Sequence, residues 1–314
     1  MAHDSPSVRE RRLAAELRRA RLAAELSGQQ VAAATSWSPS KVSRIENGRI
    51  GVKRDDLDRL LELYDVPPDA ATELRRLGRH ARARGWWEAY ADSLSAGYAT
   101  LLRLEAGSSA LRAYCALIPH PLLMTPDFIR QVVRSTWESP SPAEVERRVQ
   151  VCLRRQSVLD RGRHRSTDGA GGDDEAFRLT VILDEAVLRR SAAAAGAPSG
   201  SSGSSASHGD RDGQIRRDQF AHLADAARRP SVDIRVLPFA AGIPPVSAGS
   251  FSILESTATG APDLVYLENK TRISFVDAEN EVDRYTRDHR LLTEMALSAA
   301  DSADMLADAC GVHS

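Results

Sequence analysis

The chain has 314 residues, of which 42% are hydrophobic and 27% are charged, a composition typical of globular proteins and a length sufficient for two domains. No run is long and apolar enough to cross a bilayer, and the first residues lack the apolar core of a signal peptide, so we expect no membrane association and a cytoplasmic location. The net charge of −1 is unevenly divided: residues 1–85 hold 17 Lys and Arg against 12 Asp and Glu, a net of +5, and the remainder holds 25 against 31, a net of −6. Only the first part of the chain is therefore suited to contact nucleic-acid phosphates.

The three cysteines, Cys115, Cys152 and Cys310, are far apart in the sequence and form no CxxC pair. This pattern indicates neither a zinc site nor a disulfide framework. We expect buried thiols, no bound metal and no cofactor.

The first expected helix covers about residues 8–25. Its apolar residues recur at helical spacing and predict one buried stripe, formed by Leu13, Leu17, Ala20 and Ala24. Several arginines surround this stripe and can meet either solvent or phosphate.

Two short helices are expected between Leu26 and Gly48. Ser27 can cap the first one, Gln30 can return the capping-box bond, and Leu26 can pack on Val31 as a hydrophobic staple.

The second short helix has its own start and stop signals. Ser38 is the cap, Pro39 occupies the first helical position, and Trp37 and Val42 form the matching staple. Gly48 is a stop signal. Because helices this short do not persist alone in water, they must pack on something, and a helix-turn-helix explains the arrangement.

The second short helix has two different faces. Val42 and Ile45 are three residues apart and predict a buried stripe. The faces that this stripe does not occupy are expected to present Ser38, Ser40, Lys41, Arg44 and, just past the helix end, Arg49. Arginine and lysine can contact phosphates and guanine edges, and serine can contact phosphates or bases. The alternative is an ordinary solvated helix surface, but two staples and the ending S-R-I-E-N-G favour DNA binding.

Residues 9–66 resemble the lambda-repressor-like, XRE-type helix-turn-helix domain. The resemblance is carried by L-S-x-x-x-V-A at Leu26–Ala32 and by W-S-x-S-K-V-S-R-I-E-N-G at Trp37–Gly48. It implies an all-α domain that binds double-stranded DNA with its second short helix in the major groove.

The resemblance also implies roles for individual residues. It implies base reading from the start of the second helix and one turn later, at Ser38, Pro39, Ser40 and Arg44. It implies a structural ion pair between Arg21 and Glu46, and phosphate anchoring near Asn47 and Gly48. The complete predicted DNA-binding set is Gln29, Ser38, Pro39, Ser40, Lys41, Arg44, Asn47 and Arg49.

Three residues depart from the family pattern. Gly28 stands where the family often has Gln or Arg, and it has no side chain to make their phosphate contact. Pro39 has no amide donor or polar tip, so any readout there must be apolar. Ser36 replaces the usual turn glycine.

The first domain is expected to end near residue 84. A helix over about 54–64 is followed by Pro67-Pro68, and a further helix is expected over 69–84. The basic run of this last helix could touch DNA or form a solvated face. Gly85-Trp86-Trp87 then marks a boundary, so we predict a DNA-binding domain over 8–84 and a second domain over 85–300.

The second domain is expected to have an α+β fold. Helices are predicted at 101–116, 126–136, 143–160, 185–194, 214–228 and 278–299. Strands are predicted at 177–183, 232–237, 250–255, 263–268 and 272–276, of which the last three should form a meander. Two stretches rich in Gly, Ser and charge, about 162–175 and 195–213, are predicted to be disordered loops.

The second domain resembles the C-terminal part of a large actinobacterial family of antitoxin-like transcriptional regulators. The similar segments are Arg84–Tyr90, Ala116–Phe128, Val149–Leu159, Val181–Arg189, Val236–Gly242 and Asp263–Glu268. The resemblance implies a regulator whose second domain binds a small acidic partner protein. It implies no mechanism.

The sequence gives no support for an enzyme. Asp184 and Glu185 are adjacent and therefore point in different directions, and a helix N-cap followed by a first-turn acid is the favoured interpretation. His120 lies between two prolines without a nucleophile motif nearby. Phosphate-binding, metalloprotease and serine-hydrolase motifs are missing from the sequence.

Three functions remain open at this point. The first is a sequence-specific transcriptional regulator, a homodimer whose second domain dimerises or receives a protein partner. The alternative is a regulator whose second domain binds a small molecule, in a cavity near Trp86, Trp87, Phe239 and Phe251. The third is an interaction protein whose DNA binding is incidental. We favour the first.

Overall fold

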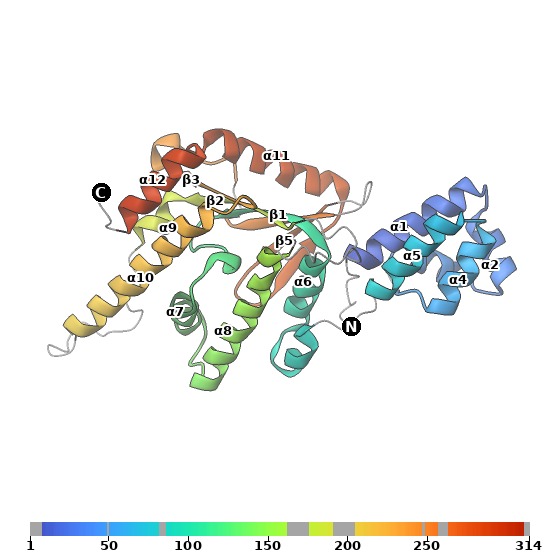
Figure 1. Ribbon diagram of the computed structural model, residues 1–314, viewed down its shortest axis with the longest axis horizontal. Coiled ribbons are helices and arrows are strands. Elements are labelled where there is room, and N and C mark those ends of the chain that lie inside the picture. The colour runs from blue at the N-terminus through green and yellow to red at the C-terminus, as the bar shows by residue number, and fades with distance from the viewer. Residues whose placement is uncertain are drawn as a thin grey trace, which may run out of the picture. The chain divides into compact units, whose positions relative to one another are not determined.

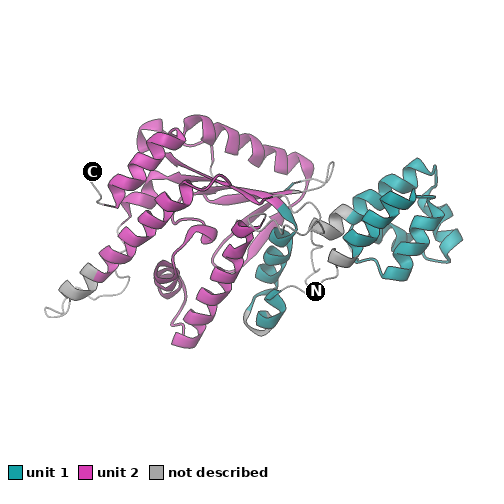
Figure 2. Cartoon of the chain, viewed as in Figure 1, with its two compact units in different colours: residues 1–108, 256–263 teal, residues 109–255, 264–314 magenta. Residues whose placement is uncertain are grey.

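The computed structural model describes residues 8–48, 50–81, 86–161, 176–190, 205–246, 249–256 and 263–310. Two compact units divide the chain, residues 1–108 with 256–263 and residues 109–255 with 264–314 (Figure 2). The first is helical and the second contains a mixed sheet with helices, as expected for an all-α domain followed by an α+β domain. No helix in the described ranges is long and apolar enough to span a membrane.

The first unit begins with five helices that correspond to those expected from the sequence. They are α1 (Val8–Ala23), α2 (Gly28–Thr35), α3 (Pro39–Glu46), α4 (Arg54–Leu63) and α5 (Pro68–Ala81). A 3₁₀ helix, η1 (Trp86–Ser93), and α6 (Ala96–Ala106) follow them.

The five helices enclose one apolar core. Leu17 and Val31 are fully buried, and Ile45 and Leu57 are each 1% exposed. Leu26 and Trp37, the outer residues of the two predicted staples, pack against the core that contains Val31 and Val42. Helix α3 thus contacts this core through the face that carries Val42 and Ile45.

Three of these helices end in the same way. Glu25, Ser36 and Asp65, which follow α1, α2 and α4, have φ angles of 56°, 60° and 49°, in the left-handed region. In each case the next residue is apolar, and its N–H donates to the carbonyl five residues earlier, at 3.1, 2.9 and 3.1 Å. This is the Schellman motif, and its apolar residue packs into the core at Leu26, Trp37 and Val66.

The second unit is built on a six-stranded sheet with the order β3-β2-β1-β4-β5-β6. The strands are β1 (Ser108–Cys115), β2 (Arg178–Asp184), β3 (Val232–Leu237), β4 (Phe251–Ser256), β5 (Leu264–Glu268) and β6 (Ile273–Val276). The first three strands are parallel, with Ala113 opposite Val181 and Val181 opposite Ile234. The last three form an antiparallel meander, which confirms that prediction.

Helices cover both faces of this sheet. In Figure 1, α11 (Glu279–Met295) lies over one face, and α7 (Pro126–Thr136) and α8 (Pro142–Gln156) lie over the other. The remaining helices are α9 (Glu185–Arg189), α10 (Ser205–Ala227) and α12 (Ala299–Ala309), with the 3₁₀ turns η2 (Pro121–Leu123), η3 (Ser157–Asp160) and η4 (Phe239–Ala241). Cys115, Cys152 and Cys310 are buried free thiols, as predicted.

The predicted helix over 101–116 is wrong in its second half. The chain instead forms α6 up to Ala106 and then β1 from Ser108 to Cys115. Strand β1 is buried on both faces, so its sequence S-S-A-L-R-A-Y-C does not alternate between apolar and polar residues. A short buried run of this kind cannot be assigned to strand or helix from its period alone.

Two further predictions need correction. The single helix over 278–299 is interrupted: α11 stops at Met295, and Ser298 caps a separate helix, α12. The predicted loop over 195–213 is wrong for residues 205–213, because α10 begins at Ser205. Gln131 of α7 donates to Asp212 at 3.1 Å, and a helix already nucleated on a buried segment extends at little cost. Residues 162–175 and 195–204 lie outside the described residues.

Candidate nucleic-acid interface

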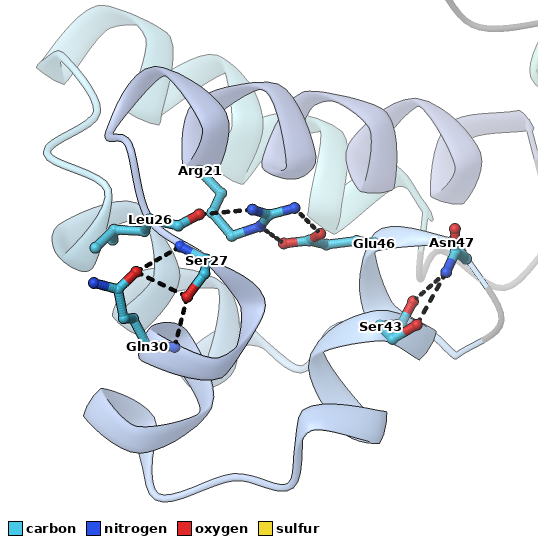
Figure 3. Close-up of polar contacts among 7 residues, drawn as sticks. All are labelled: Arg21, Leu26, Ser27, Gln30, Ser43, Glu46 and Asn47. Carbon is cyan, nitrogen blue, oxygen red and sulfur yellow. Dashed lines mark hydrogen bonds and ion pairs between the residues drawn. The ribbon is translucent and has the colours of Figure 1, made fainter.

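The start of α2 is fixed by a complete capping box. Ser27 Oγ accepts from Gln30 N at 3.2 Å, and Gln30 Oε1 accepts from Ser27 N at 2.8 Å (Figure 3). Gln29 is the first residue of the predicted DNA-binding set. It is exposed in the first turn of α2, beside this capping box. A helix start of this kind presents N–H groups that can meet an anion.

The start of α3 is also fixed by a serine. Ser38 Oγ accepts from Lys41 N at 3.2 Å and lies 3.0 Å from Ser40 Oγ. Pro39 occupies the first turn, where no N–H is needed. Ser38, Pro39 and Ser40 are all exposed.

The two faces of α3 differ completely in burial. Val42 and Ile45 are 2% and 1% exposed, whereas Ser40, Ser43 and Arg44 are exposed. Arg44 takes part in none of the ion pairs among the described residues. Its guanidinium is therefore available to a partner outside the chain.

The ion pair implied by the resemblance is present between Arg21 of α1 and Glu46 of α3. Arg21 Nε and Nη2 donate to the two Glu46 carboxylate oxygens at 2.7 and 2.9 Å, and Nη1 donates to Leu26 O at 2.6 Å (Figure 3). The two side chains are 12% and 8% exposed. Glu46 raises the pKa of Arg21, chiefly through this hydrogen bond, while burial and then the Glu46 carboxylate raise the pKa of Tyr64.

The end of α3 is held by its own side chains. Asn47 Nδ2 donates to Ser43 O at 2.8 Å and to Ser43 Oγ at 3.2 Å (Figure 3). Gly48 follows with a φ of 64°, a conformation in which glycine carries no steric penalty. The Asn47 side-chain amide is thus used within α3. The backbone N–H groups of Asn47 and Gly48 also donate within it, to Ser43 O at 3.0 Å and to Ile45 O at 2.9 Å. Arg49 lies outside the described residues.

Lys41 is oriented differently from the prediction. Its Nζ lies 2.9 Å from Asp56 Oδ2 on α4 and 3.7 Å from the centroid of the Trp37 ring. The side chain is 30% exposed. An ion pair and a cation–π contact hold this ammonium against the protein, so the structure does not present Lys41 with Ser40 and Arg44.

Sequence reasoning omitted Ser43 from the interface. It is exposed between Ser40 and Arg44 and orients Asn47. The sequence could have indicated Ser43, because it lies three residues after Ser40 and such residues share one side of a helix. On α5, by contrast, Arg75 pairs with Asp58 at 2.6 Å and Arg76 with Glu73 at 2.6 Å, so these two arginines have partners within the unit.

The acidic pair of the second unit has a structural role. Asp184 Oδ1 accepts from Ala186 N at 2.8 Å, which confirms it as the N-cap of α9, and Tyr114 donates to its other oxygen at 2.9 Å. Glu185 accepts from Phe239 N at 2.8 Å and pairs with Arg189 at 3.0 Å.

The remaining residues considered for catalysis or ligand binding are His120 and the aromatic residues of the second domain. His120 is buried, its Nε2 lies 2.9 Å from the Tyr266 hydroxyl, and burial, with Arg155, lowers its pKa. Phe251 is 3% exposed in the core, where its ring contacts those of Tyr114 and Tyr285, while Phe239 is 58% exposed. Trp86 contacts Trp87 edge-on, with ring centroids 6.0 Å apart. Among the described residues no cluster of His, Cys, Asp or Glu is arranged to hold a metal ion.

Two families of known proteins match the chain, over separate residue ranges. Residues 98–308 match a family described as a domain of unknown function, DUF5753. The chain belongs to this family. Residues 12–77 match a helix-turn-helix domain, so the surface described above belongs to a DNA-binding regulator. A search of curated proteins and a search of solved structures found no match to the chain.

Proposed function

We propose that the chain is a sequence-specific transcriptional regulator of the XRE type that binds double-stranded DNA as a homodimer through α3. The observation that carries this proposal is the division of α3 into two faces. Val42 and Ile45 are buried in the core, and the opposite side presents hydroxyls and the guanidinium of Arg44. A helix held from behind in this way can enter the major groove.

The chemistry of the exposed face fits direct readout. Arg44 can donate two hydrogen bonds to O6 and N7 of a guanine, the commonest specific contact in the major groove. Ser38 and Ser40 can each donate to or accept from a base edge or a phosphate. Pro39 offers only an apolar surface, which suits a thymine methyl group.

The positions flanking α3 would anchor the DNA backbone. Gln29 stands in the first turn of α2 beside the capping box. Asn47 and Gly48 follow the end of α3; phosphate anchoring there rests on the resemblance alone, because their N–H groups donate to Ser43 O and Ile45 O. Arg49 completes this set by resemblance. Lys41 does not belong to it, because its ammonium is held by Asp56 and Trp37.

The pair of Arg21 and Glu46 would act by positioning. It fixes the end of α3 to α1, and the bond from Asn47 to Ser43 fixes the residue that follows. A helix that is rigid before binding loses less conformational entropy on the DNA.

The second domain, about residues 85–300, would regulate this DNA reader. We infer from its resemblance to antitoxin-like regulators that it receives a small acidic protein. We infer a boundary near residue 84 from the position of the Trp86-Trp87 pair, just before the DUF5753 match at residue 98.

Selection of duplexes from a random pool tests the proposal. The full chain should enrich one sequence that is approximately two-fold symmetric, with half-sites about one helical turn, ~34–36 Å, apart. A pool that remains unenriched after selection at low salt, where phosphate contacts are strongest, would contradict sequence-specific binding.

A further inference from the structure

The backbones of the two edge strands, β3 and β6, differ in their hydrogen bonds. On β3, Val236 O accepts from Leu297 N at 2.9 Å, and Val236 N donates to Ser302 Oγ at 3.0 Å. Leu297, in the segment before α12, and Ser302 of α12 therefore occupy both outward backbone groups of Val236 on this edge. An edge strand without such cover can pair with another chain.

The opposite edge is β6, which pairs with β5 and with no other strand in the described ranges. Asn269 N donates to Arg272 O at 3.1 Å, so the backbone of Arg272 points toward β5. Antiparallel strands alternate, and the backbone groups of Ile273 and Phe275 must therefore point away from β5. Within the described part of the chain, neither residue makes a hydrogen bond on that outer side.

Charge differs between the two ends of this strand. Lys270 and Arg272 are exposed at the hairpin end, and Asp277 and Glu279 are exposed at the other. Glu268 of β5 reduces the positive charge at the hairpin end but does not cancel it. Two copies of β6 laid antiparallel would bring the cationic end of each beside the anionic end of the other, whereas parallel copies would bring like charges together.

We propose that β6 is a dimerisation edge, which pairs antiparallel with β6 of a second copy about a two-fold axis through Ser274. In this register Ile273 lies opposite Phe275 of the second copy, and all four outward backbone groups of each chain find partners. The two sheets become continuous, an isologous contact. The inference deepens the proposed function, on which it rests, because a two-fold axis is what a symmetric DNA site requires.

Replacement of Ile273 by proline tests the pairing. Ile273→Pro removes an outward N–H, and proline is tolerated on an edge strand where the N–H faces away from the sheet. Sedimentation equilibrium of the full chain should show a dimer whose dissociation constant rises at least about tenfold in this variant. The matched control, Ile273→Val, keeps the N–H and a β-branched side chain and should leave the dimer unchanged. A folded Ile273→Pro chain with the wild-type dissociation constant would overturn the inference.

Charge reversal gives a second test that does not depend on the proline variant folding. Arg272→Glu and Asp277→Arg should each weaken self-association, and mixing the two variant chains should restore a dimer. Mixed chains that associate no better than either alone would also overturn the inference.

The failure of this inference can be told apart from failure of the proposed function. A chain that enriches a two-fold symmetric DNA site and dimerises independently of β6 would contradict only the edge pairing. If the chain dimerises through β6 but enriches no DNA site, the result would contradict the proposed function and leave the edge pairing intact.

Discussion

At the scale of single residues, the pair formed by Arg21 and Glu46 connects α3, the helix proposed to read DNA, to α1. Both side chains are nearly buried, and the contact is bidentate. Removing one partner from a buried pair leaves an uncompensated charge, which costs more than the pair itself contributes. An exposed ion pair such as that of Arg19 with Glu16, whose side chains are 57% and 26% exposed, contributes little.

Arg21→Ala should therefore lower the free energy of unfolding of the first unit by about 3 kcal/mol, because it strands Glu46. Arg19→Ala, the matched control on the same helix, should change it by less than about 1 kcal/mol. Hydrogen exchange of the α1–α4 amides in the full chain measures both. The double variant Arg21→Met with Glu46→Leu should lose less than Arg21→Ala alone. Equal losses for Arg21→Ala and Arg19→Ala would show that the buried charge is not the cause.

At the scale of elements, α2 and the turn after it show how the two short helices are held at an angle. Ser36 has a φ of 60° where a left-handed residue is required, and Trp37 N then returns to Ala32 O at 2.9 Å. A non-glycine residue in this region carries steric strain. The resemblance places Ser36 where the family usually has a turn glycine. The positive φ of Ser36 explains why glycine would suit this position.

Ser36→Gly should raise the free energy of unfolding of the first unit by about 0.5–1 kcal/mol, since it relieves the strain at some cost in chain entropy. Ala33→Gly, at an exposed position inside α2, should lower it by about 1 kcal/mol. The same hydrogen-exchange measurement tests both variants. A loss of stability in Ser36→Gly would mean that its chain entropy outweighs the strain.

Local signals explain which elements could be predicted. Ser27, Ser38 and the two staples lie within a few residues of the helices that they begin, so the sequence specifies those helix starts directly. The orientation of Lys41 depended on Asp56, which is fifteen residues later and meets it only in the folded unit. β1 was missed because a strand buried on both faces has no alternating pattern.

At the scale of the whole molecule, the helical unit could be predicted more completely than the sheet. The meander from β4 to β6 could be predicted because short, turn-rich gaps separate its strands in the sequence. The parallel pairing of β1 with β2 and of β2 with β3 joins segments far apart in the chain, and no local pattern specifies such partners. The sequence also shows an uneven charge, +5 over residues 1–85 against −6 over the remainder.

The central claim is that α3 reads DNA through Arg44, and its most direct test uses the duplex recovered by selection. Affinity should be measured for wild type, Arg44→Ala and Arg76→Ala over a range of salt concentrations. Arg76 carries the same charge in the same unit but is held by Glu73. Arg44→Ala should weaken binding by about 1–3 kcal/mol and relax the preference at one base pair, whereas Arg76→Ala should leave both nearly unchanged. Wild-type affinity and salt dependence in Arg44→Ala would contradict the account.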